Sequence, residues 1–354
     1  MQIKIEKTKN PKQKPDQSNL GFGKYFTDHM FIVDYAEGKG WHDARIIPYQ
    51  PLSLDPATSV FHYGQAIFEG MKAYLSAEGK ILLFRPRKNM ERINSSDDRM
   101  SMPLIDVDFG VEAIKTLVKL DRDWIPTADG TSLYIRPFII STDPALGVRA
   151  SNTYKFIIIL SPVGAYYPQG IAPVKIYVEP EYVRAVRGGT GYAKAAGNYA
   201  GSMKAQSIAA KKGYVQVLWL DGVERKYIEE VGAMNVFFKV KGEVVTPALE
   251  GSILPGITRE SVIFLLKHWG MKVSERKISI HELQEAHNKG ELEEAFGTGT
   301  AAVISPIGEL SWNGSRMVLN YGNTGDVAHK LYDMLTGIQF GRLKDEFGWT
   351  VKVE

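Results

Sequence analysis

Predicted β-hairpins and helices are interspersed along this 354-residue chain, without the regular strand–helix–strand alternation of a doubly wound sheet. Hairpins are expected where apolar runs flank short glycine-containing turns, at residues 37–40, 78–80, 221–222 and 241–242. Helices are expected where apolar residues recur at helical spacing, at residues 89–100, 111–123, 198–212, 257–269 and 320–346. This mixture favours an α+β fold.

The length and the loop-forming residues predict two domains. At roughly 100–200 residues per domain, a chain of 354 residues is expected to form two. The strongest break is at residues 161–173, where proline and glycine cluster. We therefore predict an N-terminal domain at 21–163, an interdomain loop at 164–174 and a larger C-terminal domain at 175–354. Residues 1–20, which are rich in Lys, Pro and Gln, are predicted to be a disordered basic arm.

Composition excludes several classes of function. The chain has no cysteine, which excludes thiol catalysis, thiolate metal sites and a disulfide-built secreted domain. No apolar run approaches the roughly 18 residues of a membrane span. The net charge of +3 equals that of residues 1–20 alone, so the rest of the chain is neutral. These features predict a cytoplasmic protein without a metal site and without a nucleic-acid or membrane partner.

Two glycine-rich segments resemble nucleotide-binding loops only in part. Gly189–Lys194 has a lysine where a dinucleotide fingerprint needs its third glycine, and it lacks the ending of a P-loop. Gly297–Ala302 fits the G-x-G-x-x-A pattern, but it follows Glu291–Phe296, an acidic stretch that we expect to be helical rather than a strand. A nucleotide-binding fold is therefore disfavoured, although small residues still let backbone amides approach a ligand.

Lys194 is the most unusual candidate for chemistry. Its neighbours are alanines bracketed by Gly191 and Gly197, so it has little local bulk and no acidic partner nearby in the sequence. If this loop is buried, desolvation favours the free amine, which is the form that Schiff-base chemistry needs. The alternative is a solvated loop lysine.

A phosphorylated aldehyde cofactor would need an anion site and a carboxylate. Ile257 and Thr258 open a predicted helix after Pro-Gly, and Thr300 and Ala301 offer a second set of amides. A carboxylate beside a heterocyclic nitrogen holds that nitrogen protonated, and either of two adjacent glutamates, Glu229 and Glu230, is a candidate. The alternative for both is a solvated charge at the end of a strand.

Segments in a fixed order resemble the branched-chain amino-acid aminotransferases, which are fold-type IV pyridoxal-phosphate enzymes. The most specific is the lysine loop, Gly188–Tyr199, and the resemblance extends over about residues 25–340. The other segments that carry it are Phe68–Tyr74, Leu83–Pro86 with Asn89–Arg92, Ser132–Pro137, and Glu230–Asn235 followed by Leu254–Arg259.

This resemblance implies a small N-terminal α/β domain and a larger C-terminal domain of antiparallel strands, arranged as a pseudo-barrel, with helices. It implies pyridoxal 5′-phosphate as the cofactor, joined to Lys194, which also moves the proton between the substrate and the cofactor. The other cofactor-binding residues that it implies are Glu230 for the pyridine nitrogen, Tyr199 for the phenolic oxygen, and Arg92, Ile257, Thr258 and Thr300 for the phosphate.

The same resemblance implies the substrate-binding residues. Tyr134, Thr300 and Ala301 would lie near the α-carboxylate, and Arg136 would reach the distal carboxylate of glutamate. Tyr63, Phe68, Val148 and Tyr166 would form the apolar wall for a branched side chain. A single arginine at the pocket edge would let one pocket take both leucine and glutamate, because an unpaired buried carboxylate is very costly.

The implied reaction moves the amino group of L-leucine, L-isoleucine or L-valine reversibly to 2-oxoglutarate, giving L-glutamate, in a homodimer. Two departures from the mammalian enzymes are visible: residues 302–305 replace a Cys-x-x-Cys pair, and Ala233 replaces a threonine. The alternatives are a D-amino-acid aminotransferase or an aminodeoxychorismate lyase of the same fold type. From a different class, the alternative is a non-catalytic anion-binding protein that uses the glycine-rich loops.

Overall fold

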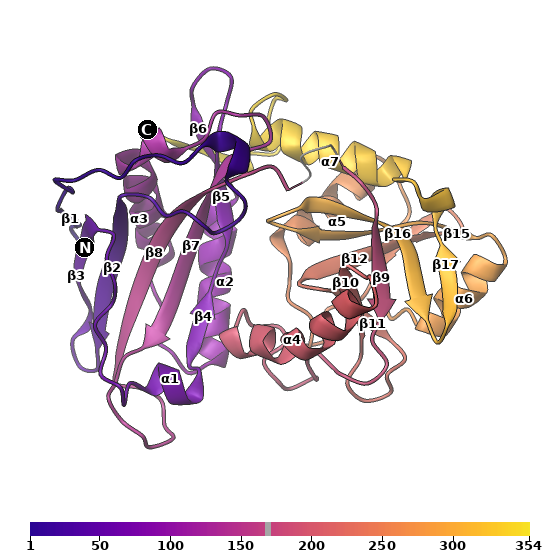
Figure 1. The fold of residues 1–354 in the computed structure, drawn as a ribbon, viewed down its shortest axis with the longest axis horizontal. Helices are drawn as coiled ribbons and strands as arrows, with labels where there is room; N and C mark the ends of the chain where they lie inside the picture. The colour runs from indigo at the N-terminus through magenta and orange to yellow at the C-terminus, as the bar shows by residue number, and fades with distance from the viewer. Residues whose placement is uncertain (167–170) are drawn as a thin grey trace. The chain divides into compact units, whose positions relative to one another are not determined.

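The computed structural model describes residues 1–166 and 171–354, and the contacts within it divide the chain into two compact units. Unit 1 comprises Met1–Pro168, Ala193–Gly197 and Gly337–Glu354, whereas unit 2 comprises Gln169–Tyr192 and Asn198–Thr336. Each unit combines strands with helices (Figure 1), so the predicted α+β class is confirmed. In the described part of the chain, none of the helices meets the length and hydropathy that crossing a bilayer requires.

The described strands of unit 1 form one nine-stranded sheet in the order β1-β3-β2-β8-β7-β5-β6-β18, with β4 paired to β7. Its strands are β1 (Lys4–Ile5), β2 (His29–Ala36), β3 (Gly40–Pro48), β4 (Ala66–Phe68), β5 (Met71–Leu75), β6 (Ile81–Phe84), β7 (Ser132–Ser141), β8 (Thr153–Val163) and β18 (Thr350–Val353). Its helices are α1 (Ser59–Tyr63), α2 (Pro86–Arg99) and α3 (Val107–Leu120), with short 3₁₀ turns at Gln17–Asn19 and Arg122–Trp124.

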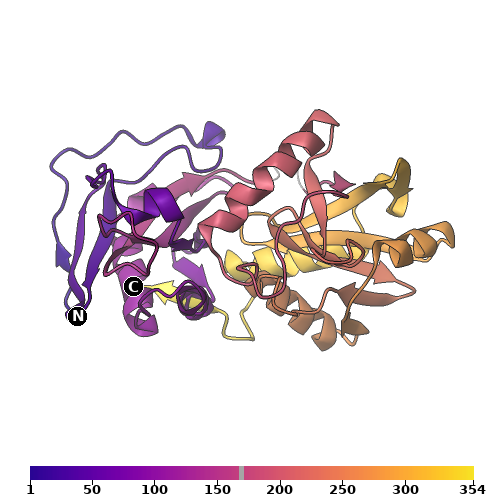
Figure 2. The same ribbon diagram turned by 90° about the horizontal axis from the view of Figure 1, so that it is seen from below.

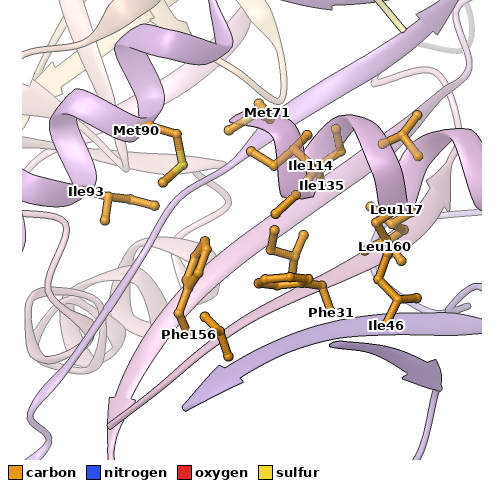
Figure 3. Close-up of a cluster of buried hydrophobic side chains, with 14 of the residues drawn as sticks. Phe31, Ile46, Met71, Met90, Ile93, Ile114, Leu117, Ile135, Phe156 and Leu160 are labelled. Carbon is orange, nitrogen blue, oxygen red and sulfur yellow. The ribbon is translucent and has the colours of Figure 1, made fainter. Parts of the chain in front are cut away.

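Helices α2 and α3 pack their apolar sides on one face of this sheet (Figure 3). The labelled side chains in this core include Met90 and Ile93 from α2, Ile114 and Leu117 from α3, and Phe31, Ile135 and Phe156 from the strands. Each such side chain contributes roughly 1.5–3 kcal/mol when it is fully buried. Because side chains alternate along a strand, the residues that flank Ile135 on β7, Tyr134 and Arg136, point to the opposite face.

Strands of unit 2 close into a six-membered ring among the described residues, in the order β11-β10-β9-β16-β15-β12, because β12 also pairs with β11. The pairings of β9 with β10 and with β16 are parallel, and the other pairings of the ring are antiparallel. The strands of this unit are β9 (Val174–Val178), β10 (Gln216–Leu220), β11 (Ile228–Val231), β12 (Met234–Val240), β13 (Glu243–Thr246), β14 (Val273–Glu275), β15 (Leu292–Gly299), β16 (Val303–Trp312) and β17 (Ser315–Val318). The predicted barrel-like arrangement is confirmed.

The helices that accompany the barrel are α4 (Ala196–Lys211), α5 (Ile257–His268), α6 (Ile280–Asn288) and α7 (Asp326–Gln339), with a 3₁₀ turn at Asn320–Gly322. Helix α4 packs against β10, where Ala205 and Ala209 contact Val217 and Trp219. Figure 2 shows the same ribbon turned by 90°. Leu218 and Leu220, which alternate with these two residues on β10, belong to the main apolar core of the unit. Small alanine side chains let the helix approach the indole ring of Trp219 closely.

The N-terminal segment differs from the disordered arm predicted for residues 1–20. Strand β1 pairs in parallel with β3, and Leu20 is buried. The Thr8 amide donates to Nε2 of His29 at 2.9 Å, and the Lys12 ammonium donates to the carbonyl of Thr27 at 2.7 Å. Polar residues that suggest a solvated arm therefore find individual partners on the sheet.

The predicted domain ranges and one predicted helix also need correction. Residues 193–197 and 337–354 belong to unit 1, where β18 pairs with β6, and not to a single C-terminal block. The predicted interdomain loop at 164–174 includes residues 167–170, which lie outside the described residues. Glu291–Phe296, predicted to be helical, lies almost entirely in strand β15. The Gly297–Ala302 loop is still not a dinucleotide fingerprint, because the hairpin partner β16 follows it instead of a helix.

The pH dependence of stability is expected to depend on Asp97 of α2. This residue is fully buried, and neither of its carboxylate oxygens has a hydrogen-bond partner among the described residues. Burial raises the pKa of the Asp97 carboxyl to about 8. An unfolded aspartate has a pKa of about 4, so between these two pKa values the folded state holds a proton that the unfolded state has released. The free energy of unfolding should therefore fall as the pH rises through that window.

Asp97→Leu removes the titrating group and should raise the free energy of unfolding by about 3 kcal/mol at about pH 8, and by less at about pH 5.5. Urea unfolding at the two pH values measures this difference. Asp98→Leu, at the exposed neighbouring position, is the matched control and should leave the pH dependence unchanged. An equal gain for Asp97→Leu at both pH values would contradict the prediction.

Candidate active site

Lys194 is held by its backbone to the sheet and to helix α2 of unit 1. Its amide donates to the hydroxyl of Ser96 at 2.9 Å, and its carbonyl accepts the amide of Phe68 at 3.1 Å. The next residue, Ala195, forms a β-bridge with Ile67. The lysine loop therefore pairs with β4 over a short distance, and its alanines are needed because Ala193 and Ala195 are both buried.

The Lys194 ammonium faces an aromatic ring and lies near a buried ion pair. Its Nζ lies 5.1 Å from the centre of the Phe68 ring. Glu69, the next residue, is fully buried. Burial alone would raise the pKa of the Glu69 carboxyl, but the Arg92 guanidinium and then the Lys194 ammonium hold this pKa below its ordinary value. The half-buried Lys194 therefore has a nearby acidic group that its sequence neighbours do not supply.

Arg92 makes a two-point ion pair with Glu69. Its Nε donates to Oε1 at 2.6 Å and its Nη2 donates to Oε2 at 3.0 Å, while Asn89 Nδ2 also donates to Oε2 at 2.8 Å. Both members of the ion pair are buried. A guanidinium carries five N–H donors, so this pairing fixes the orientation of Arg92 and is compatible with its also binding a phosphate.

Tyr134 and Arg136 stand side by side on the face of β7 opposite the helices. Arg136 Nη2 donates to the Tyr134 hydroxyl at 3.0 Å, and the guanidinium lies 4.6 Å from the centre of the Phe68 ring. Arg136 Nε is buried and has no hydrogen-bond partner among the described residues. The Arg136 guanidinium thus lies beside the rings of Phe68 and Tyr134, and its Nε–H could donate a hydrogen bond to a carboxylate oxygen. The adjacent Gly70 has to be glycine, because a Cβ there would collide with the Tyr134 hydroxyl.

In unit 2, Glu230 on β11 is a buried carboxylate with two fixed contacts. Its Oε1 accepts the Leu254 amide at 2.9 Å, and its Oε2 lies 3.3 Å from Nε of Arg184. Glu230, Arg184 and Tyr199 line the same small cavity. Two of the predicted cofactor-binding residues, Tyr199 and Glu230, are therefore brought together within this unit.

The lysine-loop motif is closed at its ends by Thr190 and Asn198. The Thr190 hydroxyl donates to Asn198 Oδ1 at 2.7 Å, and Asn198 Nδ2 donates to the Thr190 carbonyl at 2.8 Å. Gly191 packs so tightly on the Ser252 carbonyl that a Cβ would collide with it. The spacing within this motif therefore depends on the two hydrogen bonds between Thr190 and Asn198 and on the close approach of Gly191 to the Ser252 carbonyl.

The predicted phosphate-binding residues of unit 2 lie at two element ends. Ile257 and Thr258 form the first turn of α5, whose N-terminus carries the positive end of the helix dipole. Thr300 and Ala301 form the half-buried turn between β15 and β16. Val303, which follows this turn, has a φ of 63°, which is unusual and strained for a β-branched residue. The backbone at this turn is thus held in a fixed, costly conformation.

Three predicted substrate-binding residues are exposed in the single chain. Val148 is 86% exposed, and Tyr63 and Tyr166 are 42% and 47% exposed. The Tyr63 hydroxyl donates to the carbonyl of Leu146, so α1 and the loop that carries Val148 are joined.

Sequence reasoning missed several residues that position this chemistry. Arg184, Glu69 and Ser96 received no role, although each contacts a predicted site residue. Phe22 was also missed, and its ring packs edge-on against the Tyr134 ring with the ring centres 4.8 Å apart. Glu69 could have been found, because it lies in the Phe68–Tyr74 segment that carries the family resemblance. Arg184 lies outside every quoted motif, so the sequence offered no signal for it.

Similarity to known proteins shows the family of this chain. The family model for amino-transferase class IV matches residues 66–310. The chain belongs to the class IV aminotransferases. It is 65% identical over 351 residues to branched-chain-amino-acid aminotransferase 2 of Bacillus subtilis (strain 168), covering 99% of this chain and 97% of that protein.

Solved aminotransferase structures have the same fold. The branched-chain amino acid aminotransferase of Escherichia coli has a TM-score of 0.76 and 28% identity, covering 92% of this chain and 99% of that one. The branched-chain aminotransferase of Thermobaculum terrenum, solved in its PLP form, has a TM-score of 0.76 and 25% identity, covering 92% and 98%. Pyridoxal 5′-phosphate is the cofactor of this aminotransferase family.

The residues of this aminotransferase fit that cofactor. Lys194 supplies a primary amine on a fixed backbone, and Glu230 supplies a buried carboxylate that is already paired with a guanidinium. Tyr199 supplies a phenol in the same cavity as Glu230. An amine, a carboxylate and a phenol are the groups that the aldehyde, the ring nitrogen and the phenolic oxygen of the cofactor require.

Proposed function

We propose that this aminotransferase moves the amino group of L-leucine, L-isoleucine or L-valine reversibly to 2-oxoglutarate, giving L-glutamate. The proposal rests above all on Arg136, whose guanidinium lies between the rings of Phe68 and Tyr134. An aromatic wall suits a branched apolar side chain, whereas the cation suits the distal carboxylate of glutamate. One pocket with both features serves both half-reactions, which predicts ping-pong kinetics.

For the residues of unit 1, we propose three roles. Lys194 would hold the cofactor through a bond from Nζ to the aldehyde carbon, and once the substrate amine has displaced Nζ from that carbon, the freed Nζ would carry the proton from the substrate Cα to C4′. Arg92, oriented by Glu69, binds the cofactor phosphate. Tyr134 orients the substrate α-carboxylate, supported by its hydrogen bond from Arg136.

For the residues of unit 2, we propose that Glu230 binds the pyridine nitrogen and that Tyr199 donates to the phenolic oxygen. Ile257, Thr258 and Thr300 bind the phosphate with amides and hydroxyls, and Ala301 lies near the substrate carboxylate. When bound, the cofactor supplies an electron sink that accepts the pair left when the Cα–H bond breaks. Glu230 favours this chemistry because an anion beside the ring nitrogen holds that nitrogen protonated.

We further propose a homodimer in which Tyr63, Val148 and Tyr166 complete the apolar substrate wall. Support comes from the apolar surface around Val148, where Phe61 and Leu146 are 61% and 63% exposed. An exposed apolar cluster of this kind favours association. Light scattering during size-exclusion chromatography should give twice the chain mass of 39.5 kDa, and a monomer would contradict this proposal.

The cytoplasmic location, and the absence of nucleic-acid and membrane partners, stay predictions from the sequence.

Visible absorbance of the purified protein, titrated with amino acids, tests the function. We expect a yellow protein whose colour changes with L-leucine and with L-glutamate, and whose keto-acid products match those substrates. A change with D-alanine and none with L-leucine would instead favour a D-amino-acid aminotransferase. A protein that takes up no pyridoxal phosphate would favour a non-catalytic anion-binding role.

A further inference from the structure

Two adjacent carboxylates are buried in unit 2, and one of them forms an ion pair with a guanidinium. Glu229 and Glu230 on β11 are 7% and 4% exposed. Arg184 is the cation beside them: its Nε lies 3.3 Å from Glu230 Oε2, and both side chains are buried. Taking an ion pair out of water is costly, and removing one member leaves an uncompensated buried charge.

Arg184 is fixed from more than one side. Its Nη2 donates to the carbonyl of Ser252 and to the carbonyl of Gly191 at 3.3 Å. These carbonyls belong to the loop that precedes α5 and to the lysine loop, and Gly191 is the residue that has no room for a Cβ. The guanidinium therefore cannot swing away without breaking bonds to two separate loops.

The two oxygens of Glu230 are consequently held by different partners. Oε1 accepts the Leu254 amide at 2.9 Å, and Oε2 faces the fixed guanidinium. The Leu254 amide thus fixes one oxygen of Glu230 by a hydrogen bond, and the other oxygen is stabilised electrostatically by the Arg184 guanidinium, whose Nε makes no hydrogen bond among the described residues. A preorganised anion costs less to bring to a ligand than one that has to reorient.

Glu229 differs from Glu230 in its partners. Its Oε1 accepts the Ser252 hydroxyl, and its Oε2 is buried with no hydrogen-bond partner among the described residues. Burial raises the pKa of the Glu229 carboxyl, although Ser252 and Arg184 oppose this shift. Among these two carboxylates, Glu230 is the one that forms the ion pair with Arg184.

We propose that Arg184 is the positioning residue that holds Glu230 as the anionic partner of the cofactor's pyridine nitrogen. This inference rests on the role proposed for Glu230 in the preceding section. Arg184 acts on the ring nitrogen through that carboxylate. A lysine could replace its charge but not its several fixed bonds, because an ammonium lacks the planar fork of a guanidinium.

The test compares Arg184→Met, Arg184→Lys and Glu229→Gln with the wild type, each loaded with pyridoxal phosphate that carries ¹⁵N in its ring. The ¹⁵N chemical shift reports directly whether the ring nitrogen is protonated. We expect a pyridinium shift for the wild type and for Glu229→Gln, and a shift toward the unprotonated range for Arg184→Met. We expect kcat for L-leucine to fall about 100-fold in Arg184→Met with KM within about threefold, and about tenfold recovery in Arg184→Lys.

Glu229→Gln is the matched control, because it alters a buried carboxylate next in sequence that does not hold the pair. If Arg184→Met keeps the pyridinium shift and kcat of the wild type, Arg184 has only a structural role and the inference is wrong. If circular dichroism shows that Arg184→Met does not fold, the ¹⁵N chemical shift of the ring nitrogen in Arg184→Gln and Arg184→Lys tests the inference instead. Glu230→Gln separates the two proposals: an unchanged shift in that variant would overturn the role of Glu230 itself.

Discussion

Replacing Lys194 by alanine should abolish transamination and leave the fold intact. The side chain supplies both the covalent attachment point and the proton carrier, and removing such a general base alone typically costs about 10²–10⁴-fold in rate. Its backbone contacts, with Ser96 and Phe68, do not depend on the side chain, so the loop should keep its conformation. Single-turnover absorbance with L-leucine and the thermal unfolding midpoint measure the two effects.

Chemical trapping gives this prediction a second, independent measurement. Borohydride should fix the cofactor covalently to Lys194 in the wild type and leave Lys194→Ala unlabelled. Lys204→Ala, an exposed position on α4, is the matched control and should keep both labelling and activity. Labelling of a different lysine in the wild type would show that the attachment residue has been misassigned.

Arg136→Met should separate the two substrates. Its guanidinium is proposed to pair with the distal carboxylate of glutamate and 2-oxoglutarate, and a charge-assisted bidentate contact of this kind is strong. Losing it leaves the substrate carboxylate unpaired among aromatic rings, which should lower kcat/KM for glutamate by about 100-fold or more. Methionine is apolar and flexible, so the leucine half-reaction should stay within about threefold.

Separate half-reactions, followed by the cofactor absorbance with L-leucine and with L-glutamate, measure this selectivity. Arg122→Met, at an exposed position of the same unit, is the control and should change neither half-reaction. Equal losses for both substrates would mean that Arg136 supports the Tyr134 hydroxyl and the shape of the site, and does not recognise a second carboxylate.

Motifs that depend on a close backbone approach could be predicted from the sequence. Gly70 and Gly191 lie in the quoted segments because each meets a group that leaves no room for a side chain. Such a constraint acts at the residue itself, so the presence of glycine in the sequence indicates it. The hairpins at Glu78–Lys80 and Lys241–Gly242 were predicted for a different local reason, because their turns contain a glycine that can adopt a positive φ angle.

Buried charges were not predictable, because their partners come from distant segments. The acidic stretch Glu291–Phe296 was predicted to be helical, yet the Glu294 carboxylate is buried and accepts the amides of Val327 and Ala328 at the start of α7. The Arg184–Glu230 and Arg92–Glu69 pairs likewise join residues that are far apart in the sequence. From the sequence alone a charged residue is predicted to be exposed, because the group that neutralises it is identified only in the folded structure.

The short strand β11, which carries Glu230, is hydrogen-bonded along both edges, to β10 and to β12. Strands enclosed on both sides open only when the whole sheet opens, so the Glu230 amide should be among the slowest to exchange with deuterium. On moderate heating, the protein should therefore lose pyridoxal phosphate at a lower temperature than the one at which the Glu230 carboxylate moves. Gentle thermal inactivation would be reversible on cooling with added pyridoxal phosphate, up to the temperature at which the barrel itself melts.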